Sequence, residues 1–584
     1  MGIRTLTTYM NEKGHFESVT LRKVSSRIVI DGFSLSYQLF CGIGWGDYCE
    51  FYEKVLDFFT MLKSIGIEAY VVVDGIDYEN EKAATSDDRV LQRLRMMSRA
   101  KSQIEQLKKN EMIVPNLAKV VFVDAVRKTI GARFFVADGE ADRDVVSLAN
   151  HLGCPVLGLD SDFFIFNINH GLILIPHNLQ DLKTEVQYFH YQKFDRTCNF
   201  SHPQIRLFLP YCLGNDFHSR HALPELGIDQ EAKVELIVEK LNNSSLNIDD
   251  YQGELASDRK FYEVVPHSFE DLSQHSAFST SVPQWIVSRF KRGEFSRNVM
   301  HFLVGHILKG SKIWNYILVV EDIKRESAWK VTNSVLLYAI GALISCYESG
   351  SIPEIIVRVR QKSLCKLEEH NISSLLNEKH LEILGSHNLL NIPDMPKIKR
   401  RDIVLRVFQC KQISAELENV SEDLKLAVVA SRCWLMAIHS SVDHRFKAFI
   451  LALVLCLQKC LCKGSDEIKD CRNQMKALDR IHYLAQWECM LHLANTFNQI
   501  LGCPFTYTSL GRMFSATVFQ KFFVNLPNPL YSMLDEEGRI MYNAITKELL
   551  PDAPVEPVRQ AHAVRLQYSI PTQNRFASLS NFVD

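Results

Sequence analysis

The sequence has no long hydrophobic run and no excess of one charge. Its most apolar stretch, residues 448–457, is about half of the roughly 20 residues that a membrane-spanning helix needs, so it indicates a buried helix and we expect no membrane partner. Lys and Arg total 66 against 68 Asp and Glu. Because this balance does not favour a polyanionic partner, any binding of nucleic acid must come from local patches.

We expect neither a secretory leader nor a zinc site with paired cysteine spacings. No positively charged start leads into an apolar run, and Leu6 stands where a myristoylation pattern requires Ser or Thr. The 15 cysteines are therefore expected to be reduced thiols of an intracellular protein. Their only cluster, Cys456, Cys460, Cys462 and Cys471, falls partly in an apolar helical pattern, which favours packing over metal binding.

The first part of the chain alternates short apolar runs with helical patterns. The runs at 27–31, 69–74, 133–136 and 155–160 are nearly continuous in apolar character, which is typical of parallel strands buried on both faces. Residues 48–65 and 141–152 repeat apolar positions at helical spacing. These patterns predict an α/β fold with a central parallel sheet.

Chain length predicts two or three domains, because 584 residues exceed what one core usually supports. We expect an α/β domain over 1–240, a linker or loop over 241–281, a mostly α-helical second domain over 282–550 and a tail over 551–584. The linker assignment rests on a composition rich in Asn, Ser, Asp and Gln. Strand patterns are rare in the helical part.

Carboxylates recur where the predicted strands end. In parallel sheets, ligands bind beyond the carboxyl ends of the strands, so acids at these ends meet at one edge. A lone aspartate there is usually a turn residue or a helix cap, and Asp77, Asp138 and Asp144 fit that interpretation. Seven others occur jointly, with the same two-residue step in two pairs: Asp31, Asp74, Glu140, Asp142, Asp160, Asp162 and Asp216. Such a cluster indicates a site for two divalent ions that hydrolyse phosphodiester bonds.

Several motifs resemble the flap endonuclease superfamily. They are Met1-Gly2-Ile3, Ile28-Val29-Ile30-Asp31-Gly32, Val72-Val73-Asp74-Gly75, Glu140-Ala141-Asp142, Asp160-Ser161-Asp162 and Leu213-Gly214-Asn215-Asp216, in the family's order and spacing. Within that superfamily, the segment 139–157 and the long helical second half look most like the asteroid family. The resemblance implies a PIN-like nuclease domain that binds two Mg²⁺ ions, with Mn²⁺ as a substitute.

The resemblance also implies roles for single residues. Asp74, Glu140, Asp142 and Asp160 would be inner metal ligands, and Asp31, Asp162 and Asp216 would complete the shell. Lys82 and Arg89 match a catalytic pair that stabilises charge on the scissile phosphate. Gly2 and Tyr37 would contact nucleic acid, Tyr37 by stacking on a base. Arg93, Arg95 and Arg99 follow on the same predicted helix, which is either a gateway for the phosphate backbone or a solvated face.

The sequence departs from the superfamily in three places. After Asp216, a segment with one glycine and a proline replaces the family's glycine-rich helical hairpin, which leaves duplex anchoring, cleavage polarity and flap preference open. No sliding-clamp motif is found around Phe522-Phe523. Asp142 stands where the family has Glu, so it reaches one methylene less far.

These observations predict a metal-dependent, structure-specific endonuclease that cuts single-stranded, overhang or branched DNA in DNA repair. RNA as the natural substrate stays open. DNA-repair proteins would dock on the helical half. The basic run Lys397–Arg401 is either a nuclear import signal or a solvated linker, and the family resemblance favours the nucleus. The alternative is a non-catalytic nuclease-fold scaffold or adaptor in signalling or repair, against which the seven retained acids argue.

Overall fold

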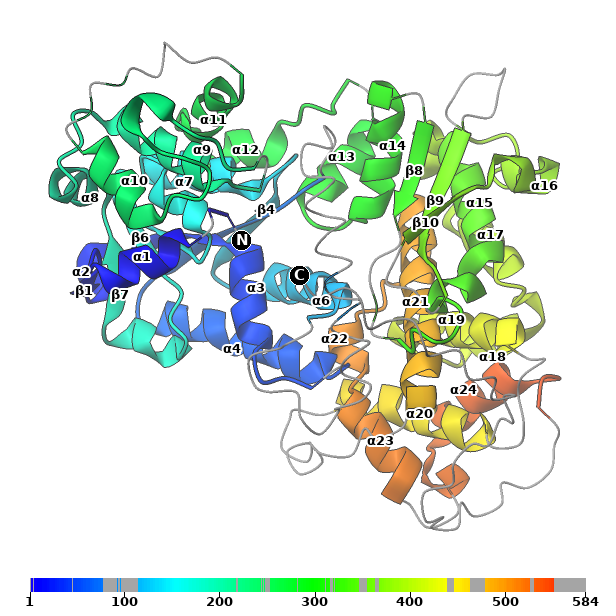
Figure 1. Ribbon diagram of the computed structural model, residues 1–584. Coiled ribbons are helices and arrows are strands. Elements are labelled where there is room, and N and C mark those ends of the chain that lie inside the picture. Colours follow the sequence, from blue (N-terminus) through cyan, green and yellow to red (C-terminus); the bar gives the residue numbers. More distant parts are fainter. Residues whose placement is uncertain are drawn as a thin grey trace, which may run out of the picture.

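The computed structural model describes most of the chain. It describes residues 2–76, 114–345, 354–438, 446–462 and 478–550 together with Gln92 and Arg95, apart from positions 4, 45, 217–218, 243, 245, 247–252, 281, 310, 316–318, 320, 363–366 and 526–529. Figure 1 shows the N-terminal sheet and its helices beside the helices of the second half. The predicted tail, residues 551–584, lies outside the described residues.

The first part of the chain folds around a seven-stranded sheet in the order β1-β7-β6-β5-β2-β3-β4. Strands β6, β5, β2, β3 and β4 run parallel, whereas β7 is antiparallel to β6 and β1. The strands are β1 (Glu17–Val19), β2 (Arg27–Asp31), β3 (Glu68–Val73), β4 (Ala132–Val136), β5 (Val156–Gly158), β6 (Leu172–Leu174) and β7 (Val186–Phe189). The predicted α/β fold with a central parallel sheet is confirmed, and β1, β6 and β7 were missed because three or four residues carry little periodicity.

Helices cover both faces of this sheet (Figure 1). Helix α7 packs on β2, β3 and β5, whereas α3, α4 and α6 cover the other face. Side chains of β2 alternate between two cores, because Val29 packs on the α7 side and Ile28 and Ile30 on the other. The helices of this part are α1 (Leu6–Glu12), α2 (Leu21–Val24), α3 (Gly32–Phe40), α4 (Tyr48–Ser64), α6 (Asn116–Lys128), α7 (Ala141–Leu152), α8 (Tyr191–Thr197), α9 (Phe208–Leu213) and α10 (Val234–Leu241).

The composition of segment 241–281 predicted a linker or loop, but the segment is not simply a linker. It contains α11 (Glu254–Tyr262) and α12 (Phe269–Gln274). Leu255 and Tyr262 of α11 are buried in the α7-side core, and Phe269 packs edge-on against Tyr70 and Phe135. Because α11 buries so few apolar residues, it showed no helical stripe in the sequence. The domain boundaries themselves stay predictions.

The second half is mostly helical but also contains a small sheet. Strands β8 (Ser311–Asn315), β9 (Glu354–Arg360) and β10 (Leu367–Asn371) pair in the order β10-β9-β8, with β8 parallel to β9. The helices are α13 (Gln284–Lys291), α14 (Arg297–Lys309), α15 (Asn333–Ile344), α16 (Glu378–Leu381), α17 (Lys397–Val407), α18 (Ser414–Glu418), α19 (Glu422–Ile438), α20 (Phe446–Cys462), α21 (Leu478–Ile500), α22 (Leu510–Met513), α23 (Ala516–Asn525) and α24 (Glu536–Thr546). Within the described ranges, none of these helices is long and apolar enough to cross a membrane.

One hydrophobic core joins the two halves. It runs from the α3, α4 and α6 face of the sheet to Trp434, Trp487 and Phe519 of the later helices. Buried hydrogen bonds accompany this packing, because Asp47, just before α4, accepts from Ser515 Oγ at 2.8 Å and from the N–H of Thr517 at 2.7 Å. The helical half therefore supports the layer of helices under the sheet.

The basic run Lys397–Arg401 begins helix α17 and is not a solvated linker. Arg400 donates to the backbone carbonyls of Leu501 and Gly502 at 3.0 and 3.1 Å. Arg401 donates to the carbonyl of Pro504 at 3.0 Å. Two of its cations thus hold the loop that follows α21, and the import function stays a prediction.

Candidate active site

Two carboxylates follow neighbouring parallel strands. Asp31 ends β2 and Asp74 follows β3, and the parallel register places Asp31 opposite Val72, so both acids reach the same edge. Asp31 is 7% exposed and caps α3 by accepting from the N–H groups of Phe33 and Ser34 at 3.2 and 3.3 Å. Burial and the nearby charge of Asp74 raise the pKa of Asp31 to about 7, although hydrogen bonds from Ser34 oppose the shift.

Two more acids open helix α7. Glu140 stands at its N-cap and Asp142 in its first turn, where the positive end of the helix dipole favours negative charge. The N–H of Ala141 donates to Asp74 Oδ1 at 3.1 Å. The acid after β3 is therefore tied directly to the start of the helix that carries the next pair.

A third pair of acids follows β5. Asp160 caps the short helix η1 (Ser161–Phe164) by accepting from the N–H of Asp162 at 3.2 Å. Asp142, Asp160 and Asp162 each offer a carboxylate oxygen, and these three oxygens lie within 4.8 Å of one another. Among the described residues, this is the only group of three or more potential ligands close enough to hold a metal ion.

Gly2 and Asp216 complete the cluster. The N–H of Gly2 donates to Asp216 Oδ2 at 3.5 Å. Gly2 has a φ of 72°, and a Cβ atom there would lie 2.1 Å from Asp160 Oδ1 and 2.5 Å from Ser161 Oγ. Only glycine fits this position. We predicted that Gly2 contacts nucleic acid, and its backbone packs against the acids; the contact with nucleic acid stays a prediction.

The fold thus brings the seven predicted acids to one edge of the sheet, and their donor chemistry fits divalent metal ions. Like charges at short range oppose ionisation, as the effect of Asp74 and Asp160 on the pKa of Asp31 shows. Several carboxylate oxygens converging on one point are the ligand set that Mg²⁺ takes in proteins. A bound cation would remove the repulsion and let all the acids ionise together. The role of each acid as a metal ligand stays a prediction.

Helix α11 adds two residues that the sequence did not reveal. Tyr262 donates its hydroxyl to Asp162 Oδ1 at 3.1 Å. Asp258, 2% exposed, accepts from Asn215 Nδ2 at 2.9 Å, next to Asp216. An acid and a tyrosine spaced i and i+4 are the signal that could have found them, had the helix been recognised. The supposed linker therefore supports two of the seven acids.

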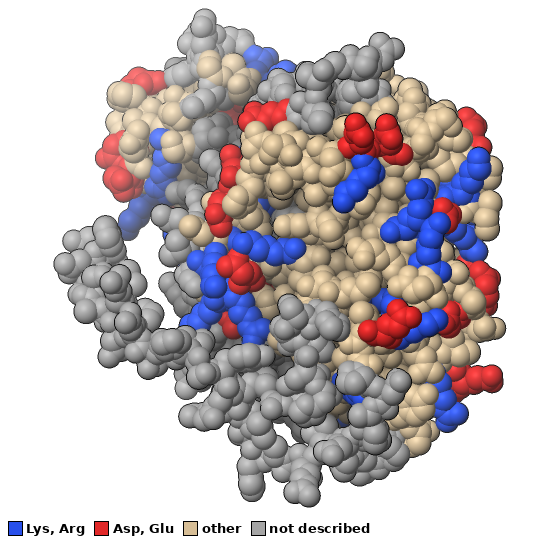
Figure 2. All heavy atoms as spheres, turned by 90° about the vertical axis from the view of Figure 1, so that its right-hand side faces the viewer, with Lys and Arg blue, Asp and Glu red and all other residues tan. Residues whose placement is uncertain are grey.

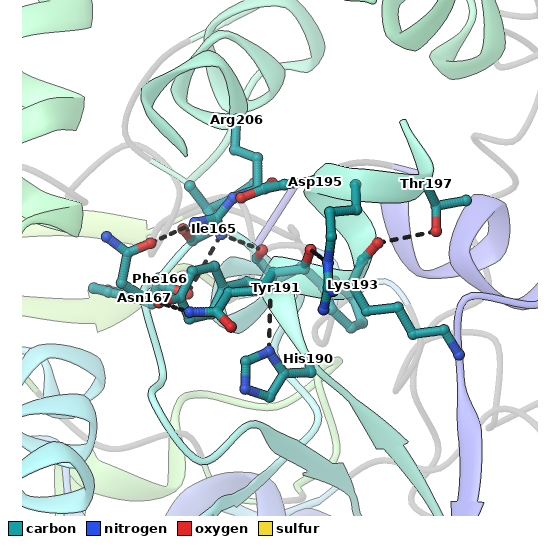
Figure 3. Close-up of polar contacts among 12 residues, drawn as sticks. Ile165, Phe166, Asn167, His190, Tyr191, Lys193, Asp195, Thr197 and Arg206 are labelled. Atoms are coloured by element: carbon teal, nitrogen blue, oxygen red, sulfur yellow. Dashed lines mark hydrogen bonds and ion pairs between the residues drawn. The ribbon is translucent and has the colours of Figure 1, made fainter. Parts of the chain in front are cut away.

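Arg206 holds the backbone just after the turn that carries Asp160 and Asp162, and Figure 3 shows its contacts with Asp195, Ile165 and Asn167. It lies on η3 (Pro203–Leu207), is 1% exposed and forms an ion pair with Asp195 at 2.7 Å. One terminal nitrogen donates to the carbonyls of Phe164 and Ile165 at 3.2 and 2.7 Å. Because these carbonyls close η1, the guanidinium fixes the backbone just beyond the acid pair. No motif marks this arginine in the sequence.

Of the five predicted basic residues, the structure describes one. Lys82, Arg89, Arg93 and Arg99 lie outside the described residues, and Asp77 does too. Arg95 is described and exposed. Tyr37 lies on α3 with 44% of its surface exposed, which leaves its ring open to a base. Their roles in binding nucleic acid stay predictions.

Two further acids near α7 were predicted to be turn residues or helix caps; Asp138 lies in a bend, whereas Asp144 lies within α7 and is neither. Asp138 forms an ion pair with buried Lys291 at 2.9 Å and accepts from Ser276 Oγ at 2.8 Å. Burial raises the pKa of Asp144 to about 6, and the charge of Lys291 opposes that shift. Both acids therefore face the cation of α13.

The segment after Asp216 contains no helical hairpin within its described residues. Positions 219–233 hold only the short helix η4 (Pro224–Leu226) and an isolated bridge between Leu223 and Ile228. The replacement of the glycine-rich hairpin, which the sequence predicted, agrees with this geometry. Duplex anchoring by that element is not expected.

Curated relatives were found for most of the chain, although no protein-family model matches it. The proteins named single-strand DNA endonuclease ASTE1 from Mus musculus and Homo sapiens are 22% and 23% identical to it. The mouse alignment covers 95% of this chain and 92% of the relative, and the human alignment covers 89% and 85%. Protein asteroid from Drosophila melanogaster is 35% identical over 178 residues, 29% of this chain and 20% of the relative.

Among solved structures, the catalytic core of Rad2 in complex with DNA substrate is 15% identical and covers 41% of this chain and 67% of that chain. Its TM-score of 0.29 is too low to support any argument. The sequence relatives instead test the predicted resemblance, because the alignments to the proteins named single-strand DNA endonuclease run through both halves of the molecule. The resemblance predicted from the motifs is confirmed: the chain is a homologue of the proteins named single-strand DNA endonuclease ASTE1.

Proposed function

We propose that this chain is a metal-dependent endonuclease that hydrolyses phosphodiester bonds of single-stranded, overhang or branched DNA, with two Mg²⁺ ions and Mn²⁺ as a substitute. The observation that carries the proposal is the convergence of acids from β2, β3, α7 and the β5 turn, with Asp142, Asp160 and Asp162 within 4.8 Å of one another. The names of the relatives support single-stranded DNA as the substrate class.

The acids divide into a centre and a surround. This division differs from the one that the resemblance implied: Asp142, Asp160 and Asp162 would hold the ions at the centre, and Asp31, Asp74, Glu140 and Asp216 would complete the shell. When bound, two such ions supply an activated water and neutralise charge on the phosphate. Tyr262 fixes the orientation of the Asp162 carboxylate through its hydroxyl. Gly2, with no side chain, keeps the backbone close to Asp160.

We expect the DNA strand to follow the edge of the sheet where the seven acids meet, called the acid edge below, and not the far face of the helical half. Figure 2 shows that face, where Lys and Arg are interspersed with Asp and Glu among the described residues. Ion pairs such as that of Arg401 with Glu422, at 2.8 Å, neutralise cations of the helical half. A backbone-binding groove would instead show one sign of charge. The helical half is proposed to dock DNA-repair proteins in the nucleus, as the family resemblance suggests.

The experiment is cleavage of labelled DNA by the purified full chain. Single-stranded, overhang, flap and duplex substrates are compared with Mg²⁺, with Mn²⁺ and with EDTA, beside the Asp160→Ala variant. We expect cleavage of the first three substrates, little cleavage of duplex, and none with EDTA or in the variant. Cleavage that survives Asp160→Ala, or that persists in EDTA, would exclude this site.

A further inference from the structure

Arg297 brings a cation from the second half to the acid edge. It is the first residue of α14, and its Nε donates to the carbonyl oxygen of Gly75 at 2.6 Å. Its guanidinium lies 5.3 Å from the centre of the Phe33 ring, within the range of a cation–π contact. Gly75 follows Asp74 directly, and Phe33 stands two residues after Asp31. The side chain therefore sits beside the ends of both acid-bearing strands.

The charge of Arg297 acts on the acids of the site. Desolvation lowers its pKa, while the charges of Asp74 and Glu140 raise it. A second cation lies on the same ring, because Lys119 Nζ of α6 is 4.1 Å from the centre of Phe33. Two basic groups from different parts of the chain thus flank one ring at the margin of the acid cluster.

The hydrogen bonding of Arg297 differs from that of an arginine that serves packing alone. Arg206 is 1% exposed, and its guanidinium donates to Asp195, to Asn167 and to backbone carbonyls. Arg297 keeps part of its surface exposed to solvent, although packing desolvates its guanidinium, and among the described residues it bonds only through Nε. Its two terminal nitrogens keep the planar fork that matches the oxygens of a phosphate. The anchored Nε and the ring below fix the direction of that fork.

We propose that Arg297 binds the non-bridging oxygens of a phosphodiester in the DNA strand that lies at the acid edge. The inference rests on the proposed function, because it assumes that a DNA strand is the ligand of this edge. It gives the second half a direct part in the site, since the fork that grips the phosphate comes from α14 while the acids come from the sheet. Lys82 and Arg89 were predicted from their short distance to Asp74 in the sequence. Arg297 gave no such signal, because it is separated from Asp74 by more than 200 positions.

A different role for the same geometry is that of an internal counter-ion. In that case, Arg297 would hold Asp74 and Glu140 together and never touch the strand. The two roles predict different measurements, because a counter-ion changes metal binding and stability, whereas a phosphate ligand changes DNA affinity and its dependence on salt.

The test is binding of a short fluorescent single-stranded DNA by the full chain, followed by anisotropy. Ca²⁺ replaces Mg²⁺, and a gel confirms after each titration that the strand is intact. Arg297→Ala and Arg297→Lys are compared with Arg292→Ala, a matched control whose exposed guanidinium pairs with Glu294 at 3.1 Å. Thermal unfolding with and without Mn²⁺ is recorded for each variant.

We expect Arg297→Ala to weaken binding about tenfold, as loss of a charged hydrogen-bonded pair does. The slope of log affinity against log salt should fall in magnitude by about 0.7, the value of one phosphate on a single strand. Arg297→Lys should restore the slope and only part of the affinity, because an ammonium lacks the fork. Arg292→Ala should bind as the wild type does, and Mn²⁺ should stabilise every variant equally.

Unchanged affinity and slope in Arg297→Ala would overturn the inference, as would loss of Mn²⁺ stabilisation without loss of DNA affinity. The outcome is separate from that of the proposed function. A chain that binds DNA through Arg297 but does not cut it contradicts only the proposed function. A chain that cuts DNA while Arg297→Ala binds normally contradicts only this inference.

Discussion

Buried carboxylates occur both at the acid edge of the sheet and, as Glu321, in the helical half, but their neighbours differ in charge. Glu321, 5% exposed, pairs with Arg360 at 2.9 Å, and that guanidinium also donates to the carbonyls of Ile323 and Arg325, each at 2.9 Å. Asp31 accepts from backbone N–H groups and Ser34, and its other neighbours include the carboxylates of Asp74 and Asp160.

The difference shows what each region is built to do. The chain itself supplies the cation for Glu321, so that pair is complete when the protein is folded. At the edge, acids are brought together by strand ends and helix caps, and their repulsion is left for ions from solution to neutralise. Changes at the first region should therefore affect stability, and changes at the second should affect activity and metal binding.

The largest expected effect is on cleavage by Asp162→Asn. The substitution keeps the shape and the acceptor for Tyr262 but removes a charge, so the cleavage rate should fall by about 10⁴-fold, roughly 5 kcal/mol. The free energy of unfolding without metal should not fall. Single-turnover cleavage and denaturant unfolding measure the two quantities, and Asp402→Asn, at an exposed acid paired with Lys411, is the control. Near-normal cleavage would remove Asp162 from the site.

The next effect is on stability in the helical half. Arg360→Met leaves the carboxylate of Glu321 buried without its partner, which should lower the free energy of unfolding by about 3–5 kcal/mol. Adding Glu321→Leu should restore most of that loss, because a buried pair can be replaced by apolar groups at small cost. If Arg360→Met unfolds like the wild type, the pair is not the structural element described.

The stabilisation of the protein by metal should depend on the acid edge and not on the pair of Glu321 and Arg360. At Mn²⁺ concentrations of about 100 times its dissociation constant, the free energy of unfolding should rise by about 2.7 kcal/mol. Asp160→Ala should lose this gain, and Arg360→Met should keep it from a lower starting value. Thermal unfolding with and without Mn²⁺ tests this, and an equal gain in all three proteins would mean that the ion binds elsewhere.

The smallest effect concerns Glu488, a buried acid without a cation at its carboxylate among the described residues. It accepts from the Tyr48 hydroxyl at 3.4 Å, and burial raises its pKa from 4.5 to about 8. The folded state thus keeps a proton that the unfolded state loses, so stability falls as pH rises through this window. Glu488→Gln should remove most of that fall, which is on the order of 2 kcal/mol between about pH 6 and pH 7.5. Unfolding of both proteins across the window measures it, and parallel pH profiles would contradict the assignment.

Sequence alone predicted the parts of the fold that repeat strongly. The strand ends at Asp31 and Asp74 and the acids of α7 were found because buried parallel strands are continuous in apolar character and an edge collects their ends. Helix α11 was missed, since it buries few apolar residues. Strands β8 to β10 were missed as well, because local patterns of five to seven residues compete with helical ones.

Contacts between distant segments could not be predicted from the sequence for a different reason. Arg206 and Arg297 owe their places to tertiary packing, and nothing in the residues around them marks a partner 40 or 222 positions away. Tyr262 could have been found only as part of a recognised helix, and even then its partner Asp162 lies 100 positions away. Motif spacing predicts which acids meet, whereas the groups that orient them follow only from the fold.

The central claim is that the seven acids form one centre for two divalent ions. The most direct measurement counts the Mn²⁺ ions bound per chain by the purified protein and by an Asp160→Ala, Asp162→Asn double variant. The account predicts two ions in the wild type and a loss of both in the double variant, while Arg360→Met still binds two. No bound ion in the wild type, or the same number in the double variant, would contradict it.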